Sequence, residues 1–303
     1  YKYFGTFELF GDGGILTRAA AGDFPAGYVG GALAAGAFVP FLMFFGATGK
    51  SAQAPLYVWL PDANGFLFTE TPRDWLPALG VMYTVGADGF ASLLVVLTAF
   101  LTALSVESAQ TKIADGQKSF YALLLWMCSA LIGAFVSLDL VLFYVCFEAV
   151  LIPAYFLIGM FGGAGRVQAG LKFLLYTLVG SLLMLVSIIA LYLHAGQTFD
   201  YVKILEAVTA NPMTGGLAAV AFAGFALAFA IKTPLFPFHT WLPDTYAEAP
   251  LPVTMVLAGA MGKLGVYGFY RFVLPLFPDL SRQAAPAFVW LAVAAIIYGA
   301  LVA

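Results

Sequence analysis

Long apolar segments without a charged residue recur along this chain, and they constrain its fold more than any other feature. Crossing the hydrocarbon core of a bilayer takes about 20 helical residues, and six uncharged segments have about that length or more. Two further spans surround Glu148 and Lys263, at Leu140–Phe161 and Val253–Phe272. The sequence therefore predicts eight membrane helices. The six uncharged ones are Phe24–Gly49, Gly89–Val106, Phe120–Leu138, Phe173–Leu193, Ala207–Ile231 and Gln283–Ala303.

The composition agrees with a chain embedded in lipid. With 62% hydrophobic and 10% charged residues, the chain has too few polar side chains to cover a soluble globule. The apolar segments also lack the alternation of period two that the strands of a transmembrane barrel need. We therefore expect an all-α fold, a polytopic transmembrane helix bundle.

The sequence lacks the motifs of several other classes of function. No basic tract of five or more residues is present, so nucleic acid is not an expected partner. No Gly-x-Gly-x-x-Gly motif follows a strand, and no cysteine cluster occurs. We expect the chain itself to bind no cofactor or metal, so any redox centre would belong to partner subunits.

Positive residues between the spans divide into two groups if the helices cross in alternate directions. Cytoplasmic loops carry an excess of Lys and Arg, so the larger group indicates the cytoplasmic side. The first group holds four residues and the second holds three. They are Lys112, Lys118, Arg166 and Lys172 on one side, and Lys203, Arg271 and Arg282 on the other.

One motif occurs twice, at positions 50–62 and 232–244. The surrounding sequence does not repeat, which indicates two diverged modules or a join between pieces of two related proteins. The polar, irregular stretch Asn64–Ala78 marks the boundary. We predict two domains, 1–63 with one span and a half-helix and 64–303 with the remaining bundle, in a chain expected to be a fragment that is truncated at its C-terminus. The identities are Lys50/Lys232, Pro55/Pro237, Trp59/Trp241, Leu60/Leu242, Pro61/Pro243 and Asp62/Asp244.

The second copy of this motif predicts a break in a membrane helix. Proline has no N–H and clashes with the carbonyl four residues earlier, so Pro234 and Pro237 would free the carbonyls of Ala230 and Thr233. Unpaired carbonyls are costly in lipid, and discontinuous helices therefore line cavities and ion sites. We expect a broken helix near residues 216–242, with Lys232 at the break.

Three ionisable residues within predicted spans are candidates for a proton pathway. A lysine in a span costs roughly 2.5–3.5 kcal/mol on insertion scales, which makes Lys232 and Lys263 candidate functional residues. Lys263 lies near the centre of its span among glycines that let helices or water approach. A Glu148 carboxylate opposite Lys232 would hold the lysine proton, and separation would release it. The alternatives are lysines that extend to the headgroups and a static ion pair.

Other polar residues have supporting or structural interpretations. His239 and Tyr267 could relay a proton through hydrogen bonds, and the alternative for each is an amphipathic side chain at a contact between helices. Asp139, at the edge of a span, suits a helix N-cap. We expect an exposed loop at His194, Asp200, Lys203 and Glu206.

Three motifs resemble those of a known membrane family. The motifs at 147–153 (Phe-Glu-Ala-Val-Leu-Ile-Pro), 232–250 and 262–268 (Gly-Lys-Leu-Gly-Val-Tyr-Gly) are similar to the M-type antiporter-like subunit of bacterial respiratory complex I, NADH:quinone oxidoreductase. That subunit is related to multisubunit cation/proton antiporters. The resemblance covers roughly residues 64–303, whereas residues 1–63 look like the neighbouring L-type subunit. Tyr246 departs from the M-type pattern, which usually has His there.

The resemblance implies a function and a set of site residues. Glu148, Lys232 and Lys263 would match the family's proton-path residues, so the chain would be a proton-translocating subunit of NADH:quinone oxidoreductase in a bacterial plasma (inner) membrane. Its partners would be other membrane subunits and lipid, with NADH and quinone reached only through other subunits. Lys50 is a secondary candidate, because its module contains no glutamate partner or second lysine. The alternatives are a subunit of a cation/proton antiporter or a membrane-bound hydrogenase, and a non-conducting scaffold.

Overall fold

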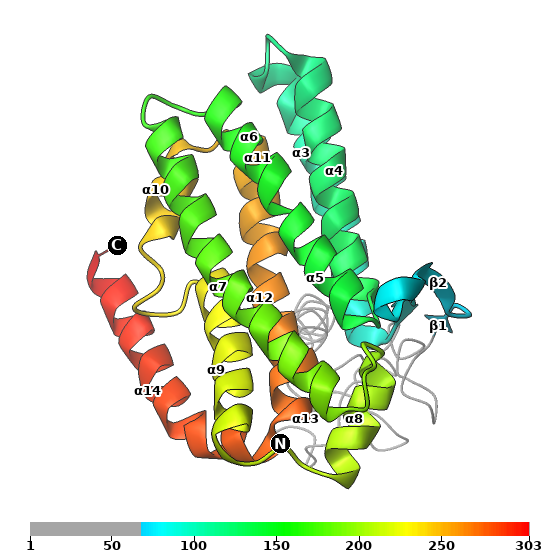
Figure 1. Ribbon diagram of the computed structural model, residues 1–303. Coiled ribbons are helices and arrows are strands. Elements are labelled where there is room, and N and C mark those ends of the chain that lie inside the picture. The colour runs from blue at the N-terminus through cyan, green and yellow to red at the C-terminus, as the bar shows by residue number, and fades with distance from the viewer. Residues whose placement is uncertain (1–67, 303) are drawn as a thin grey trace, which may run out of the picture. The chain divides into compact units, whose positions relative to one another are not determined.

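The computed structural model describes residues 68–302 (Figure 1). Residues 68–87 and 91–302 belong to one compact body. The predicted span Phe24–Gly49, the domain 1–63 and the secondary candidate Lys50 lie outside the described residues, so the expectations about them stay predictions.

Seven stretches of helix in the described part of the chain are long and apolar enough to cross a membrane. Each corresponds to one predicted span, which confirms the all-α polytopic fold. Their helices are α3 (Gly89–Lys112), α4 (Gln117–Val136), α5 (Leu140–Ala149) with α6 (Leu151–Phe161), α7 (Arg166–His194), α9 (Gly215–Lys232), α11 (Leu251–Val256) to α13 (Leu274–Leu276), and α14 (Pro278–Val302).

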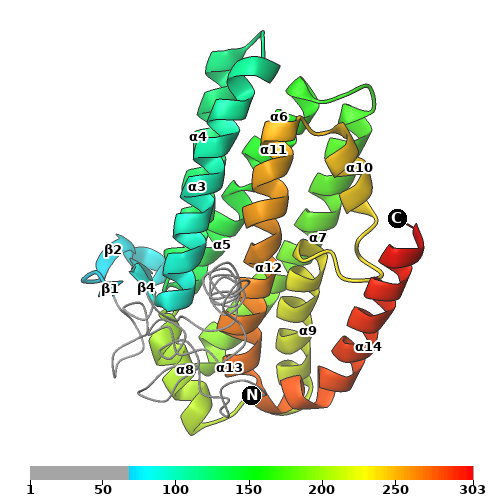
Figure 2. The same cartoon turned by 180° about the vertical axis from the view of Figure 1, so that it is seen from behind.

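Successive spans run in alternate directions, as Figures 1 and 2 show from opposite sides. The α3–α4 and α6–α7 connections lie at the end where α11 begins, and the α4–α5 and α13–α14 connections lie at the other end. Lys112 ends α3 and Arg166 begins α7, whereas Arg282 lies near the start of α14. This arrangement agrees with the predicted division of positive residues between the two sides.

Two short hairpins precede the first described span. Strand β1 (Phe68–Thr69) pairs with β4 (Gly86–Ala87), and β2 (Arg73–Leu76) pairs with β3 (Val81–Tyr83) after the 3₁₀ turn η2 (Pro77–Leu79). The hairpins lie partly within the stretch that the sequence indicated as irregular.

Asp139 ties the second hairpin to the start of α5. Its Oδ1 accepts the N–H groups of Val141 at 2.8 Å and Leu142 at 3.1 Å, as the predicted N-cap should. Its Oδ2 accepts the N–H of Met82 in β3 at 3.1 Å. Burial raises the pKa of the Asp139 carboxyl, although these three N–H groups act in the opposite direction.

The expectation of an exposed loop at 194–206 holds for the non-helical residues 195–200 but is wrong for residues 201–206, where Lys203 and Glu206 are exposed on a helix. Residues Tyr201–Ala210 form helix α8, which begins after Asp200, whose side chain caps the N–H groups of Val202 and Lys203. The buried residues of α8 are Tyr201, Ile204 and Val208, spaced to lie on one helical face. The predicted span 207–231 is likewise divided, because the chain leaves α8 before Pro212 and re-enters a helix only at Gly215.

The span from α11 to α13 contains two stretches of π-helix. The order is α11, η3 (Leu257–Met261), α12 (Gly262–Gly268), η4 (Phe269–Val273) and α13. The wider turn of a π-helix changes which residues face the bundle, and such turns occur frequently at functional sites. The chain therefore departs from a regular helix on both sides of Lys263.

Phenylalanine rings fill the core between α5, α9 and η4. The ring centroids of Phe143 and Phe272 are 4.5 Å apart, and Phe229 lies 6.1 Å from Phe147 and 5.9 Å from Phe225. All five side chains are buried. Because lipid is as apolar as these rings, close packing rather than exclusion from water holds membrane helices together. This core supports the end of α9 that carries Lys232.

Candidate ion-translocation site

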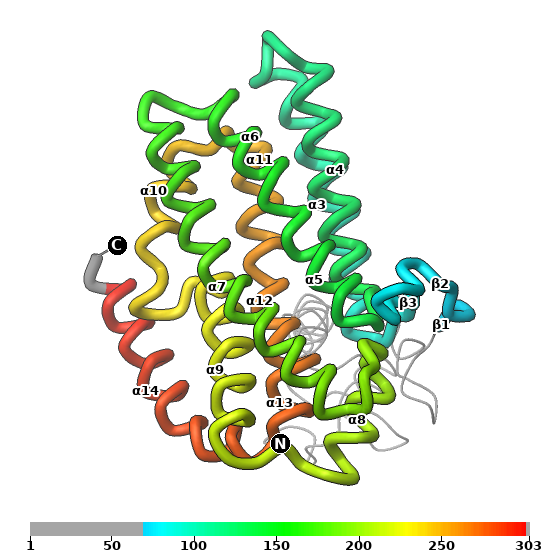
Figure 3. The backbone as a smooth tube through the Cα atoms, viewed as in Figure 1, coloured from blue at the N-terminus to red at the C-terminus, as the bar shows by residue number. Residues whose placement is uncertain are grey.

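The predicted break occurs where the prolines indicated it. Helix α9 ends at Lys232, and helix α10 (Trp241–Glu248) begins only after the non-helical residues 233–240, as the tube in Figure 3 shows. The carbonyl of Ala230 is not free as predicted, because it accepts the N–H of Leu235 at 2.9 Å. The carbonyl of Ile231 accepts the indole N–H of Trp241 at 3.1 Å. The carbonyls of Ala230 and Ile231 at the break are therefore both paired.

Lys232 is enclosed at this break. Its side chain is buried, with 1% of the residue exposed. The Nζ atom lies 4.7 Å from the ring centroid of Phe147 and 6.0 Å from that of Phe173, where the ring faces attract a cation. Such burial argues against the alternative of a lysine that extends to the headgroups. The side chain instead points into the bundle.

Glu148 of α5 acts on Lys232 without a direct hydrogen bond. The carboxylate and the ammonium influence each other electrostatically, and Ser181 of α7 also acts on the carboxylate. Neither Glu148 Oε1 nor Lys232 Nζ has a hydrogen-bond partner among the described residues. Glu148 Oε1 and Lys232 Nζ therefore lack the closed contact that a static ion pair between them would have.

Buried polar atoms without a partner concentrate around the break. Six such side-chain atoms occur among residues 69–300, and four of them belong to Glu148, Lys232, Thr233 and His239. A buried polar group without a hydrogen bond is costly, so each one needs a reason. Their grouping marks this region as the chemically unusual part of the bundle. The sequence pattern did not single out Thr233, because a lone threonine carries no signal of burial.

Lys263 lies at mid-span, as predicted, but its side chain is exposed rather than enclosed. It belongs to the span Leu251–Leu276, and its Nζ donates to the carbonyl of Ala258 at 2.8 Å. Ala258 lies in the π-helical stretch η3, where the widened turn alters the carbonyl partners. Gly265, and not Lys263, is the residue of α12 that faces the break. A Cβ added to Gly265 would lie 2.8 Å from the Thr233 nitrogen.

Tyr267 and His239 occupy different environments. The hydroxyl of Tyr267 donates to the carbonyl of Phe135 in α4 at 2.8 Å and accepts from Arg271 Nε at 3.1 Å. Tyr267 therefore joins α12 to α4, which agrees with the structural alternative. His239 lies in the break and stacks on Phe236, with centroids 5.5 Å apart, while its Nδ1 has no partner among the described residues.

Helix α10 is fastened to α7 by two side-chain contacts that the sequence did not suggest. Lys172 Nζ lies 2.7 Å from Asp244 Oδ2, and the hydroxyls of Tyr176 and Thr240 are 2.7 Å apart. Lys172 and Tyr176 are one helical turn apart on α7, so both contacts lie on one face. We call these two contacts the α7–α10 latch.

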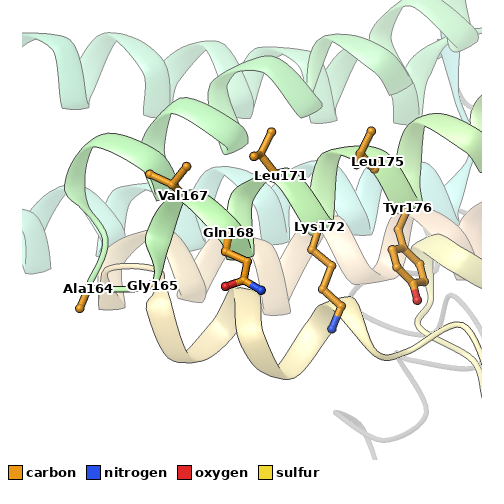
Figure 4. Close-up of a pocket in the computed structure, with 8 residues that line it drawn as sticks. All are labelled: Ala164, Gly165, Val167, Gln168, Leu171, Lys172, Leu175 and Tyr176. Atoms are coloured by element: carbon orange, nitrogen blue, oxygen red, sulfur yellow. The ribbon is translucent and has the colours of Figure 1, made fainter.

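A groove runs along α7 beside the latch. Gln168, Lys172 and Tyr176 point to one side of the helix, whereas Leu171 and Leu175 point to the other (Figure 4). The polar side chains therefore form a line that leads from the start of α7 toward the depth of the break.

Tyr246 of α10 stands outside the spans. Burial raises the pKa of Tyr246 to about 12, so its phenol stays protonated near neutral pH. The departure from the family's histidine therefore places a group that does not titrate there.

The fold and the site together define a class of protein. Discontinuous helices with ionisable groups at the break, inside a polytopic bundle, are an architecture of membrane ion carriers. A family described as "NADH:quinone oxidoreductase/Mrp antiporter, TM" matches residues 137–303. The chain belongs to this family and is an integral membrane protein.

Relatives and solved structures agree with this assignment. Subunit M of NADH-quinone oxidoreductase from Rickettsia prowazekii is 44% identical, and the match covers 79% of this chain and 48% of that subunit. Subunit M from Rhodobacter capsulatus is 42% identical, and the match covers 80% of this chain and 48% of that subunit. Respiratory complex I from Thermus thermophilus has a chain with a TM-score of 0.69 and 37% identity, covering 95% of this chain and 57% of that one. The Mrp complex from Dietzia sp. has a chain with a TM-score of 0.62 and 28% identity, covering 73% of this chain and 24% of that one. This chain spans about half the length of the curated relatives it matches.

Proposed function

We propose that this chain translocates protons as an antiporter-like membrane subunit of a bacterial NADH:quinone oxidoreductase. The observation that carries the proposal is Lys232, which is buried at a helix break, lacks a hydrogen-bond partner among the described residues and is coupled to Glu148. The names of the relatives support the assembly to which the chain would belong. NADH oxidation and quinone reduction would take place in other subunits.

The proton step depends on electrostatic coupling. The proton affinity of a buried lysine depends on its separation from a nearby carboxylate. A charge change elsewhere in the complex that moves Glu148 relative to Lys232 would therefore load or release the Lys232 proton. Lys263 would exchange that proton at mid-span, and His239, which lies in the break, would be a further proton carrier.

Two other functions make different predictions. Similarity to the Mrp complex favours a subunit of a cation/proton antiporter as the second candidate, which would move protons without quinone reduction. A scaffold that only contacts neighbouring subunits would not need Lys232 or Lys263 to titrate.

The experiment is proton pumping by the assembled complex in membrane vesicles. Lys232→Ala and Lys263→Ala are expected to abolish the share of pumping that depends on this chain while the complex still assembles. The exposed Lys203→Ala, on α8, is the matched control and should pump normally. Unchanged pumping in both variants would rule out proton translocation through these lysines and leave the scaffold as the function. Sodium-dependent proton movement without quinone reduction would favour the antiporter subunit.

A further inference from the structure

We propose that the α7–α10 latch controls access of protons to Lys232 from the side of the membrane where α7 begins. The inference rests on the proposed proton translocation and adds the place where the site opens. A short series of contacts connects the buried Lys232 to the partly exposed residues Lys172 and Asp244.

An aromatic wall separates Lys232 from α10. The rings of Phe173 and Trp241 are 5.4 Å apart between centroids, and both side chains are buried. Phe173 is also the ring that lies 6.0 Å from Lys232 Nζ. Phe173 therefore lies next to both the lysine and the first residue of α10, so displacing Trp241 would remove one ring of the wall and free Phe173 to move off the lysine.

The latch lies directly outside this wall. Lys172 precedes Phe173 in α7, and Thr240 precedes Trp241 in the chain, so each latch contact adjoins one ring of the wall. The side chains of Lys172 and Asp244 are 34% and 54% exposed. An aqueous proton can therefore reach the latch while the wall remains closed.

Helix α10 is built to move as a unit. It has eight residues and follows the non-helical residues 233–240, which allow it to turn relative to α9. Besides the latch, its far end is held by Glu248, whose carboxylate accepts the N–H of Gly165 at 2.8 Å. Release of the latch would leave α10 attached at that far end and, at its near end, by the hydrogen bond from the Trp241 indole N–H to the Ile231 carbonyl. Once that bond also opens, the near end of α10 would swing from Phe173.

The size of the effect follows from the exposure of the ion pair. A partly exposed ion pair contributes little to stability, so the latch would open by thermal motion, and removing the pair would raise the open population about two- to fivefold. The Tyr176–Thr240 hydrogen bond contributes a comparable factor. Loss of both contacts is expected to raise the open population about tenfold.

Cysteine labelling tests this directly. Thr233→Cys is introduced into a chain whose two free cysteines, Cys128 and Cys146, are replaced by alanine. The assembled complex in oriented vesicles is treated with a membrane-impermeant maleimide from each side. Labelling is expected from the side of Lys172, about two- to fivefold faster in Asp244→Asn.

Further variants separate the latch from a general loss of structure. Lys172→Met breaks the same ion pair from α7 and should match Asp244→Asn, and adding Tyr176→Phe should bring the increase to about tenfold. The matched control is Asp279→Asn, which breaks the exposed Arg282–Asp279 pair of α14 and should leave labelling unchanged.

Three results would overturn the inference: labelling only from the opposite side, no labelling in any variant, or equal rates with and without the latch. Labelling does not require pumping, so its failure is distinct from failure of the proposed function. If Lys232→Ala abolishes pumping but the latch variants do not change labelling, only this inference falls. If the labelling behaves as expected and Lys232→Ala pumps normally, the proposed function falls instead.

Discussion

Gly265→Ala is expected to disturb the site by contact with the Thr233 hydroxyl and with backbone atoms at the end of α9. A Cβ at this position would lie 2.8 Å from both the Phe229 carbonyl oxygen and the Thr233 nitrogen. These backbone atoms lie in the last turn of α9 and in the residue that follows it, on either side of Lys232, and they cannot rotate away as a side chain could. Helix α9 must therefore shift away from α12.

The magnitude is set by comparison with a second glycine of the same helix. Overpacking of this kind costs about 1–3 kcal/mol, whereas replacing a helical glycine by alanine gains about 1 kcal/mol of helix propensity. At Gly262 an added Cβ meets only the Leu257 carbonyl oxygen, at an ordinary 3.8 Å. Gly262→Ala has the same gain in helix propensity without the clash. The stability of the two variants should therefore differ by about 1–3 kcal/mol.

Hydrogen–deuterium exchange of the assembled complex measures this difference locally. Amides of residues 225–235 are expected to exchange roughly 5- to 150-fold faster in Gly265→Ala than in Gly262→Ala, since about 1.4 kcal/mol corresponds to a factor of ten. Pumping should fall in Gly265→Ala and be retained in Gly262→Ala. Equal protection in the two variants would refute the close approach of α12 to the break.

Three further predictions concern single contacts. Trp241→Phe keeps a ring against its neighbour but removes the N–H bound to the Ile231 carbonyl, so exchange at the end of α9 should rise by the equivalent of about 0.5–1.5 kcal/mol; unchanged exchange would show that the bond does not hold the break. Burial raises the Asp139 pKa above its usual 3.8, so the native state keeps that proton to higher pH than the unfolded state, and the stability contribution of Asp139 should fall as pH rises through this window. Asp139→Asn should remove that slope in unfolding measurements, and a slope that persists would assign it to another group. Because the pKa of Tyr246 is about 12, Tyr246→Phe should leave the pH profile of pumping near neutrality unchanged; a shifted profile would mean that this phenol exchanges protons.

The spans and the break could be predicted from sequence because each depends on local chemistry. An uncharged run of sufficient length has few alternatives to a membrane helix, and Pro234 and Pro237 remove donors whatever surrounds them. The partner of the Ala230 carbonyl was not predictable, since it depends on how the chain turns after Thr233. Helix α8 was missed because it has only ten residues, and Lys203 and Glu206 separate its buried residues along the sequence although they lie on the exposed side of the helix.

The orientation of side chains could not be predicted where it depends on distant segments. Lys263 has the same mid-span position that the sequence indicates, yet the π-helical turns beside it point its ammonium toward Ala258. The latch joins Lys172 to Asp244, 72 residues apart in the chain, and the repeated motif that contains Asp244 gives no sign of Lys172 as its partner. Such contacts follow from the packing of α10 on α7, which the sequence alone does not specify.

If the chain translocates protons, Lys232 and Glu148 must change their protonation or charge interaction during turnover. Infrared difference spectra of the assembled complex, recorded before and after addition of NADH, measure this directly through the carboxyl vibrations. We predict a carboxyl difference band that disappears in Glu148→Gln and is shifted or lost in Lys232→Met. A band that is unchanged in both variants would contradict a proton pathway through this pair.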